Sequence, residues 1–249
     1  MITWDSVEVA YNGVNVLGPV TVTVGDGEWV GLIGPNGAGK STMLKAAVGL
    51  VDAGGDIRLK NGHRRPGLDI AWMPQRPTMP DQMGVTDYVM LGRSPHVGYL
   101  GGEGAADREA VAGAIRRLDL EGFARRPLST LSGGEAQRAV LARSIAQEAP
   151  VLLLDEPTAN LDVGHAIEVL EVIDDLRSGG LTVVTAIHDL TLAGRFCQRL
   201  VFLADGKVVA DGSPREVLTE ELLRPHYGDS VRVIDDVDGP LVVPGRKRK

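Results

Sequence analysis

One glycine-rich segment constrains this chain more than any other feature. Residues 28–33 read Glu-Trp-Val-Gly-Leu-Ile, a short and mostly apolar strand of the kind buried in a parallel sheet. Gly-Pro-Asn-Gly-Ala-Gly-Lys-Ser follows at 34–41, and a helix is expected from 40 to 49. The glycines let the backbone curl until several N–H groups point at one set of phosphate oxygens, and the helix adds its positive dipole end. The segment predicts a nucleotide-binding loop; the plain alternative is a glycine turn that joins a strand to a helix.

Two side chains of this loop have chemistry suited to a nucleoside triphosphate. Lys40 supplies a cation for the β- and γ-phosphates, and the hydroxyl of Ser41 is a potential ligand for Mg²⁺. The residues predicted to bind the nucleotide here are Gly34, Pro35, Asn36, Gly37, Ala38, Gly39, Lys40, Ser41 and Thr42.

Two adjacent carboxylates follow a second apolar run. Residues 151–154 read Val-Leu-Leu-Leu, and Asp155, Glu156 and Pro157 come directly after them. In open α/β sheets, ligands gather at the carboxyl ends of the strands. Asp155 is suited to hold Mg²⁺, and Glu156 to polarise the water that attacks the γ-phosphorus. Taken alone, the pair could also mark a strand that ends in solvent.

Strands that alternate with helices predict an α/β fold with a parallel-rich sheet and right-handed crossovers. Alternating apolar residues at 6–11 and 20–24, with a turn at 12–13, predict an antiparallel β region at the N-terminus. Residues 1–249 are expected to form a single domain with its core at about 1–75 and 149–235, a mainly helical subdomain inserted at about 76–148, and a tail at 236–249. Further strands are expected at 57–60, 69–73, 181–187, 200–203 and 207–211, and further helices at 85–91, 105–118, 135–147, 164–177 and 190–199.

A third motif, Leu131-Ser-Gly-Gly-Glu135, precedes the helix at 135–147. A Ser-Gly-Gly start leaves helix N–H groups open to an anion, although it could equally be a simple N-cap. The five residues resemble the signature motif of ABC ATPases, and with the two motifs above the resemblance runs across nearly the whole chain. It implies a P-loop NTPase (ABC ATPase) core that uses ATP and Mg²⁺, with Leu131, Ser132, Gly133, Gly134 and Glu135 as further nucleotide-binding residues.

The same resemblance implies roles for four more residues. Tyr11 matches the aromatic that stacks on adenine, and Gln75 matches the glutamine that reaches Mg²⁺ and the attacking water. Asp162, retained in the loop after the acidic strand, is implied to be a further nucleotide-binding residue, although Ala159 replaces the usual serine of that loop. His188 matches a histidine that touches the γ-phosphate. The implied catalytic residues are Glu156, His188 and Gln75, and the implied metal ligands are Ser41, Gln75 and Asp155. Taken singly, the aromatic, the glutamine and the histidine have ordinary structural interpretations.

The resemblance also implies partners. ABC ATPases bind two nucleotides between head-to-tail copies, so residues 132–135 of one copy would contact the phosphates bound by Lys40 of the other. Integral-membrane permease subunits would convert the motion into transport, and a substrate-binding protein would take part indirectly.

Composition narrows where such a protein works. Lys and Arg number 26 against 33 Asp and Glu, and the net charge of −7 argues against a nucleic-acid partner. No run approaches the roughly 20 apolar residues of a membrane span, and residues 1–5 lack a signal-peptide pattern. We expect a peripheral protein on the cytoplasmic face of the plasma (inner) membrane. The basic block at 246–249 is interpreted as a solubilising tail, with a lipid or partner contact as the alternative.

Residues 89–101 bear on the transported substrate. They read Val-Met-Leu-Gly-Arg-Ser-Pro-His-Val-Gly-Tyr-Leu-Gly and resemble a stretch of the ATPases of iron-siderophore, haem and cobalamin importers. The predicted function is therefore the ATP-hydrolysing subunit of an importer for a metal chelate. Alternatives are the ATPase of a zinc or manganese importer and, less favoured, a soluble ABC ATPase outside transport or a non-hydrolysing regulatory module. A flexible glycine-proline loop without substrate meaning is the plain alternative for this stretch.

Overall fold

The computed structural model describes residues 1–60, 62, 65–97, 101–159 and 161–245. The chain forms two compact units, Met1–His63 with Thr182–Lys249, and Arg64–Leu181. Parts of three predicted features lie outside the described residues: positions 98–100 of the 89–101 stretch, Asn160 in the loop before Asp162, and the basic block at 246–249.

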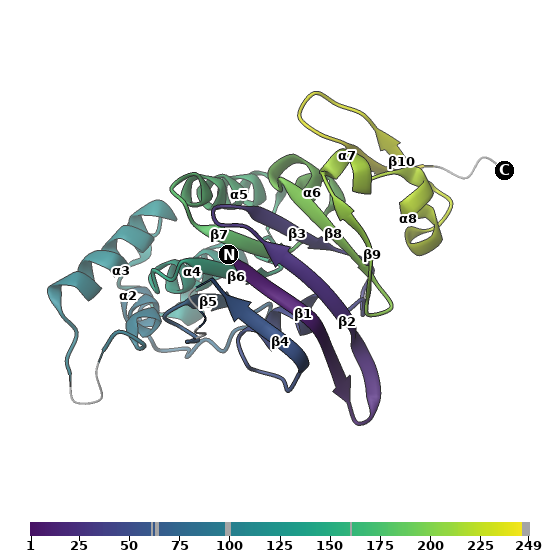
Figure 1. Cartoon of the computed structure of the whole chain (residues 1–249). Coiled ribbons are helices and arrows are strands. Elements are labelled where there is room, and N and C mark those ends of the chain that lie inside the picture. The colour runs from purple at the N-terminus through teal and green to yellow at the C-terminus, as the bar shows by residue number, and fades with distance from the viewer. Residues whose placement is uncertain (61, 63–64, 98–100, 160, 246–249) are drawn as a thin grey trace. The chain divides into compact units, whose positions relative to one another are not determined.

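The first unit begins with an antiparallel sheet in the order β2-β1-β4, as predicted for the N-terminus (Figure 1). Its strands are β1 (Ile2–Tyr11), β2 (Val14–Val24) and β4 (Gly54–Leu59). The strands are longer than their alternating segments because shifts in the β1–β2 register interrupt the pattern, with Ser6 at a positive φ of 52°. Trp4 is fully buried, and its indole N–H donates to the Met43 carbonyl at 3.1 Å, which fixes the sheet to the first helix.

A second sheet of the first unit carries the loop that the sequence predicts to bind nucleotide. Strand β3 lies between β7 and β8 with parallel pairing on both sides, and β9 pairs antiparallel with β8. The strands are β3 (Trp29–Ile33), β7 (Thr182–Ala186), β8 (Arg199–Ala204) and β9 (Lys207–Gly212). Every residue of β3 and β7 is buried, which explains why β3 is mostly apolar. The two polar residues of β7, Thr182 and Thr185, both form hydrogen bonds through their hydroxyls.

The described residues of the first unit include the helices α1 (Lys40–Ala47), α6 (Leu190–Phe196), α7 (Pro214–Val217) and α8 (Glu220–Tyr227). Helix α6 ends earlier than the predicted 190–199. The chain is already extended at Cys197, and the backbone N–H of Gln198 donates to the Trp29 carbonyl at 3.1 Å. A bond to the sheet therefore replaces the next helical bond at this point.

The C-terminal segment expected as a tail at 236–249 contains a strand. Strands β10 (Val231–Ile234) and β11 (Leu241–Pro244) pair antiparallel. The Val242 backbone exchanges hydrogen bonds with the Thr191 hydroxyl of α6, at 3.0 and 3.2 Å. This contact gives the segment a fixed partner within the first unit.

The second unit combines a parallel strand pair with a helical group. Strands β5 (Ile70–Met73) and β6 (Val151–Asp155) run parallel, and the hydroxyl of Ser144 donates to the Trp72 carbonyl at 3.1 Å. The helices are α2 (Val85–Met90), α3 (Ala105–Arg117), α4 (Gly133–Ile145) and α5 (Val163–Ser178), with the 3₁₀ turns η1 (Leu91–Arg93), η2 (Glu121–Phe123) and η3 (Leu128–Thr130). In the parts of the chain that the structure describes, no helix is long and apolar enough to cross a membrane.

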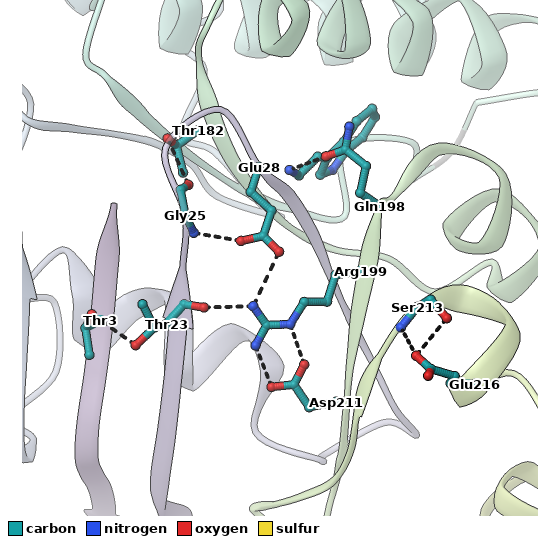
Figure 2. Close-up of polar contacts among 11 residues, drawn as sticks. Thr3, Thr23, Gly25, Glu28, Thr182, Gln198, Arg199, Asp211, Ser213 and Glu216 are labelled. Carbon is teal, nitrogen blue, oxygen red and sulfur yellow. Dashed lines mark hydrogen bonds and ion pairs between the residues drawn. The ribbon is translucent and has the colours of Figure 1, made fainter.

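Arg199, at the start of β8, joins several elements of the first unit (Figure 2). Its guanidinium forms two hydrogen bonds to the Asp211 carboxylate of β9, at 2.5 and 2.6 Å. It also donates to the Thr23 carbonyl of β2 at 2.9 Å and to the Glu28 carboxylate at 3.3 Å. The fork of an arginine suits such a multiple contact, which ties the two sheets of this unit together.

We predict that Arg199→Met lowers the free energy of unfolding by about 2 kcal/mol, because hydrogen bonds to charged groups are among the stronger ones. Urea-induced unfolding measures the change. Arg116→Met is the matched control, since its single pair with Glu109 is exposed on both sides and should contribute less than about 0.5 kcal/mol. Equal effects of the two substitutions would contradict the assignment.

Candidate functional site

The loop after β3 has a backbone that requires glycine. Gly34 has a φ of 146°, and a Cβ atom there would lie 2.0 Å from the Leu203 carbonyl oxygen. Gly37 and Gly39 also have positive φ values, 81° and 100°, in the region that side chains disfavour. Gly39 caps α1, whose first turn contains no acidic residue. This is a helix start electrostatically suited to an anion.

Lys40 curls back over the loop. Its ammonium donates to the carbonyls of Gly34 at 2.6 Å and Pro35 at 3.0 Å, and the residue is only 6% exposed. The loop is further closed by the Ala38 N–H, which donates to the Pro35 carbonyl at 3.2 Å. The structure thus places the predicted residues 34–42 in a loop and the first turn of α1, with the Lys40 ammonium held at the carbonyls that begin the loop. Such a turn can bind phosphate oxygens.

Tyr11 and His188 belong to the same unit as this loop. Tyr11 ends β1 opposite Val14 and is 42% exposed, so its ring is accessible. His188 is exposed and follows β7 by two residues. The next residue, Asp189, caps α6 by accepting from the backbone N–H groups of Thr191 and Leu192, at 2.9 and 3.0 Å.

The second unit brings two predicted catalytic residues together at the end of β6. Asp155 ends the strand and is 2% exposed, while Glu156 follows it with a positive φ of 54°. The side-chain amide of Gln75 donates to the Glu156 carboxylate, with Nε2 and Oε2 2.7 Å apart. A glutamate rarely adopts this backbone conformation, so surrounding contacts must hold it.

Gln137 is a residue of this site that motif spacing did not predict. Its Nε2 donates to the carbonyls of Glu156 at 3.2 Å and Pro157 at 3.0 Å, and the residue is 8% exposed. One signal was available in the sequence. Gln137 shares the buried face of α4 with Val140, Leu141 and Ser144, and a polar residue on such a face needs a hydrogen-bonding partner.

The Leu131–Glu135 motif forms a reciprocal cap at the start of α4. The Glu135 carboxylate accepts from the Ser132 backbone N–H at 2.7 Å, and the Ser132 hydroxyl accepts from the Glu135 N–H at 3.3 Å. The bond from Ser132 holds the pKa of Glu135 below its ordinary value. Ser132 and Gly133 are exposed, so the helix start is accessible from outside.

Asp162 caps α5 in a similar way. Its carboxylate accepts from the His165 backbone N–H at 2.9 Å and contacts the His165 ring nitrogen Nδ1 at 2.8 Å. These contacts lower the pKa of Asp162, with the backbone bond as the largest cause. In this structure, Asp162 fixes the start of the helix after the acidic strand.

The 89–101 stretch is anchored through Arg93, which is 5% exposed. Its guanidinium donates to Asp107 at 2.9 Å, and to Glu148 and the Ala146 carbonyl at 2.8 Å each. His96 adds a contact of 2.7 Å between its Nε2 and the Gln147 carbonyl. These contacts do not fit a flexible loop at residues 91–97; they fasten this stretch to α3 and to the end of α4.

The cap at Ser132 and Glu135 predicts a pH dependence. A glutamate with a lowered folded pKa stabilises the fold above its unfolded pKa, and this contribution is lost as the pH falls through the folded pKa. In a titration followed by backbone-amide NMR, the Ser132 signal should therefore move with a midpoint below that of an unperturbed glutamate. A midpoint at or above that value would contradict the cap.

A family model described as ABC transporter matches residues 17–159. The cobalamin import ATP-binding protein BtuD of Halobacterium salinarum is 43% identical over 97% of this chain, and the chain spans 62% of that relative's length. The ferric enterobactin transport ATP-binding protein FepC of Escherichia coli is 38% identical over 96% of this chain and 92% of its own. The hemin import ATP-binding protein HmuV of Streptomyces coelicolor is 41% identical over 96% of this chain and 88% of its own.

Solved structures agree with these matches. An ABC transporter assigned to the metal-chelate type, in an inward-facing conformation, superposes with a TM-score of 0.85 at 27% identity, covering 99% of this chain and 98% of that chain. A dimeric ATP-binding cassette, MJ0796 with ADP and Pi, has a TM-score of 0.78 at 27% identity. The match covers 86% of this chain and 98% of that chain. The chain therefore belongs to the ABC transporter family, among its ATP-binding proteins.

Proposed function

We propose that this chain is the ATP-hydrolysing subunit of an importer for a metal chelate. The observation that carries the hydrolytic part is the Gln75–Glu156 pair, because it fixes a carboxylate directly after the buried Asp155. The cargo class is supported by relatives named for the import or transport of cobalamin, ferric enterobactin and hemin. Cobalamin, ferric enterobactin and hemin are all metal-bearing chelates.

The proposed chemistry assigns a separate task to each group. The loop amides at 34–42 and the Lys40 ammonium bind the phosphates of ATP. Glu156 accepts a proton from the attacking water, which Gln75 helps to orient. His188 contacts the γ-phosphate, and the exposed ring of Tyr11 stacks on the adenine.

Mg²⁺ fits the donor chemistry of the proposed ligands. Ser41 offers a hydroxyl oxygen, Gln75 an amide oxygen and Asp155 a carboxylate, all hard oxygen donors. Gln75 donates to Glu156 through Nε2, so the opposite end of the amide is the end that can ligate a cation. Within the described residues, no three His, Cys, Asp or Glu side chains cluster as a metal site. In the proposed site, nucleotide phosphates would hold most of the cation's coordination shell, and the cation would offset their negative charge.

The proposed assembly has two copies of the chain and separate membrane permease subunits. The exposed start of α4 at Ser132 and Gly133 supports contact with a nucleotide bound by the second copy. The dimeric cassette MJ0796 supports the same arrangement. A substrate-binding protein would act only through the permease. We place the subunit on the cytoplasmic face of the membrane, and we retain the proposed division into a core and an inserted helical subdomain at about 76–148.

The Glu156→Gln variant tests this proposal. It should bind ATP normally, lose at least about 10²-fold in ATP turnover because the proton acceptor is gone, and accumulate as a dimer with ATP. Steady-state hydrolysis and size-exclusion chromatography with light scattering measure both effects. Normal turnover in this variant would remove Glu156 from its proposed role.

Adding Ser132→Arg to Glu156→Gln provides the matched control for the dimer. The larger, charged side chain at the start of α4 should block the second copy while each single chain still binds ATP. If single-chain ATP binding were also lost, the cross-subunit role of residues 132–135 would be wrong.

A further inference from the structure

The side chain of Gln137 is buried, yet it points at the backbone of the proposed catalytic residue. Its amide nitrogen lies 3.2 Å from the Glu156 carbonyl oxygen and 3.0 Å from the Pro157 carbonyl oxygen, and the residue is 8% exposed. Burying an amide is costly unless its polar atoms find partners. Both carbonyls belong to the turn that follows β6, so this glutamine supplies hydrogen bonds to a segment outside regular secondary structure.

That turn is where the backbone is least favourable. Glu156 has a φ of 54°, and such a conformation in a residue with a side chain persists only when its surroundings enforce it. The Glu156 carbonyl accepts one local bond, from the Ala159 N–H at 3.1 Å, and Gln137 adds a second. At Pro157, the carbonyl is held by Gln137 as well. The contacts of Gln137 therefore fall on the strained residue and on its successor.

The carboxylate of Glu156 is held independently of its backbone. Gln75 donates to its Oε2 at 2.7 Å. One glutamine thus fixes the backbone and another fixes the carboxylate. Gln75 alone cannot define where the carboxylate lies if the turn beneath it is free to move.

We propose that Gln137 is a positioning residue that holds the Glu156 backbone so that its carboxylate stays aligned with the attacking water. This inference rests on the proposed role of Glu156. It also connects two motifs within one chain, because Gln137 lies five residues after Ser132 on α4. Five residues of helix span roughly 8 Å at 1.5 Å per residue. A movement of the Leu131–Glu135 motif would therefore be transmitted through this short piece of α4 to the turn at Glu156.

Two substitutions test the proposal, judged by the split between kcat and KM for ATP. Gln137→Met keeps the side-chain volume but removes both donors. We expect kcat to fall about 10- to 100-fold, because small misplacements of a reacting group have effects of this size. KM and ATP affinity should stay near their wild-type values. The melting temperature should fall slightly, because the buried Pro157 carbonyl loses its donor.

Gln137→Glu adds a pH signature that simple destabilisation would not produce. Its new carboxyl faces two carbonyl oxygens, so the charged form repels them while the protonated form can donate to one. The kcat of this variant, as a fraction of wild type, should therefore rise as the pH is lowered from 8 to 6. This variant also keeps the test decisive if the methionine variant does not fold.

Gln198→Met is the matched control. Gln198 also binds a backbone group through its side chain, accepting from the Trp29 N–H at 2.9 Å, but at the start of β3 rather than at its nucleotide-binding end. Its kcat should be unchanged. The proposal is overturned if folded Gln137→Met turns over normally, or if its ATP affinity falls together with kcat. Normal turnover in Glu156→Gln would instead overturn the proposed function.

Discussion

Position 34 has no room for a side chain, and the proposed nucleotide-binding loop of the first unit depends on that constraint. A Cβ atom there would lie 2.0 Å from the Leu203 carbonyl oxygen of the adjacent strand β8. Only glycine fits where the chain leaves β3 so close to β8, and Gly34 has a φ of 146° there. After this loop, the Lys40 ammonium donates to the carbonyls of Gly34 and Pro35. Helix α1 also begins here, and the backbone amides of its first turn can face an anion. The close packing of β3 against β8 and the proposed phosphate binding therefore both depend on Gly34.

The second unit contains the carboxylate of Glu156, the proposed proton acceptor. Glu156 leaves a buried strand in a backbone conformation that costs of order 1–3 kcal/mol. Hydrogen bonds from Gln75 and Gln137 hold its side chain and its backbone separately. Strain that is stabilised by several independent contacts is typical of functional sites. The second unit therefore presents the carboxylate in one defined position.

The positions of the strands and of several site residues could be predicted from the sequence, because apolar runs and motifs depend on neighbouring residues alone. Strands β3 and β6 coincide with mostly apolar runs of the sequence, because a strand buried on both faces accommodates few polar side chains. The motif positions also led to Gln75 and Glu156, which the structure places in contact. Arg93 and Gln137 were missed because a long polar side chain in a helical pattern usually faces solvent. Only the folded chain shows the carboxylates and carbonyls that they meet. Strands β10 and β11 were missed because they pair with each other and are held through contacts between Val242 and Thr191, which only the folded chain shows.

The central claim is that loop 34–42 binds the phosphates of ATP with the Lys40 ammonium as its cation. Isothermal titration of Mg²⁺–ATP into the wild-type chain and into Lys40→Met tests it most directly. The substitution keeps most of the side-chain length and removes the charge. Wild type should bind one ATP per chain, and the variant should bind about 10- to 100-fold more weakly, as expected for a lost hydrogen bond to a charged group. Equal affinities in the two proteins would contradict the account.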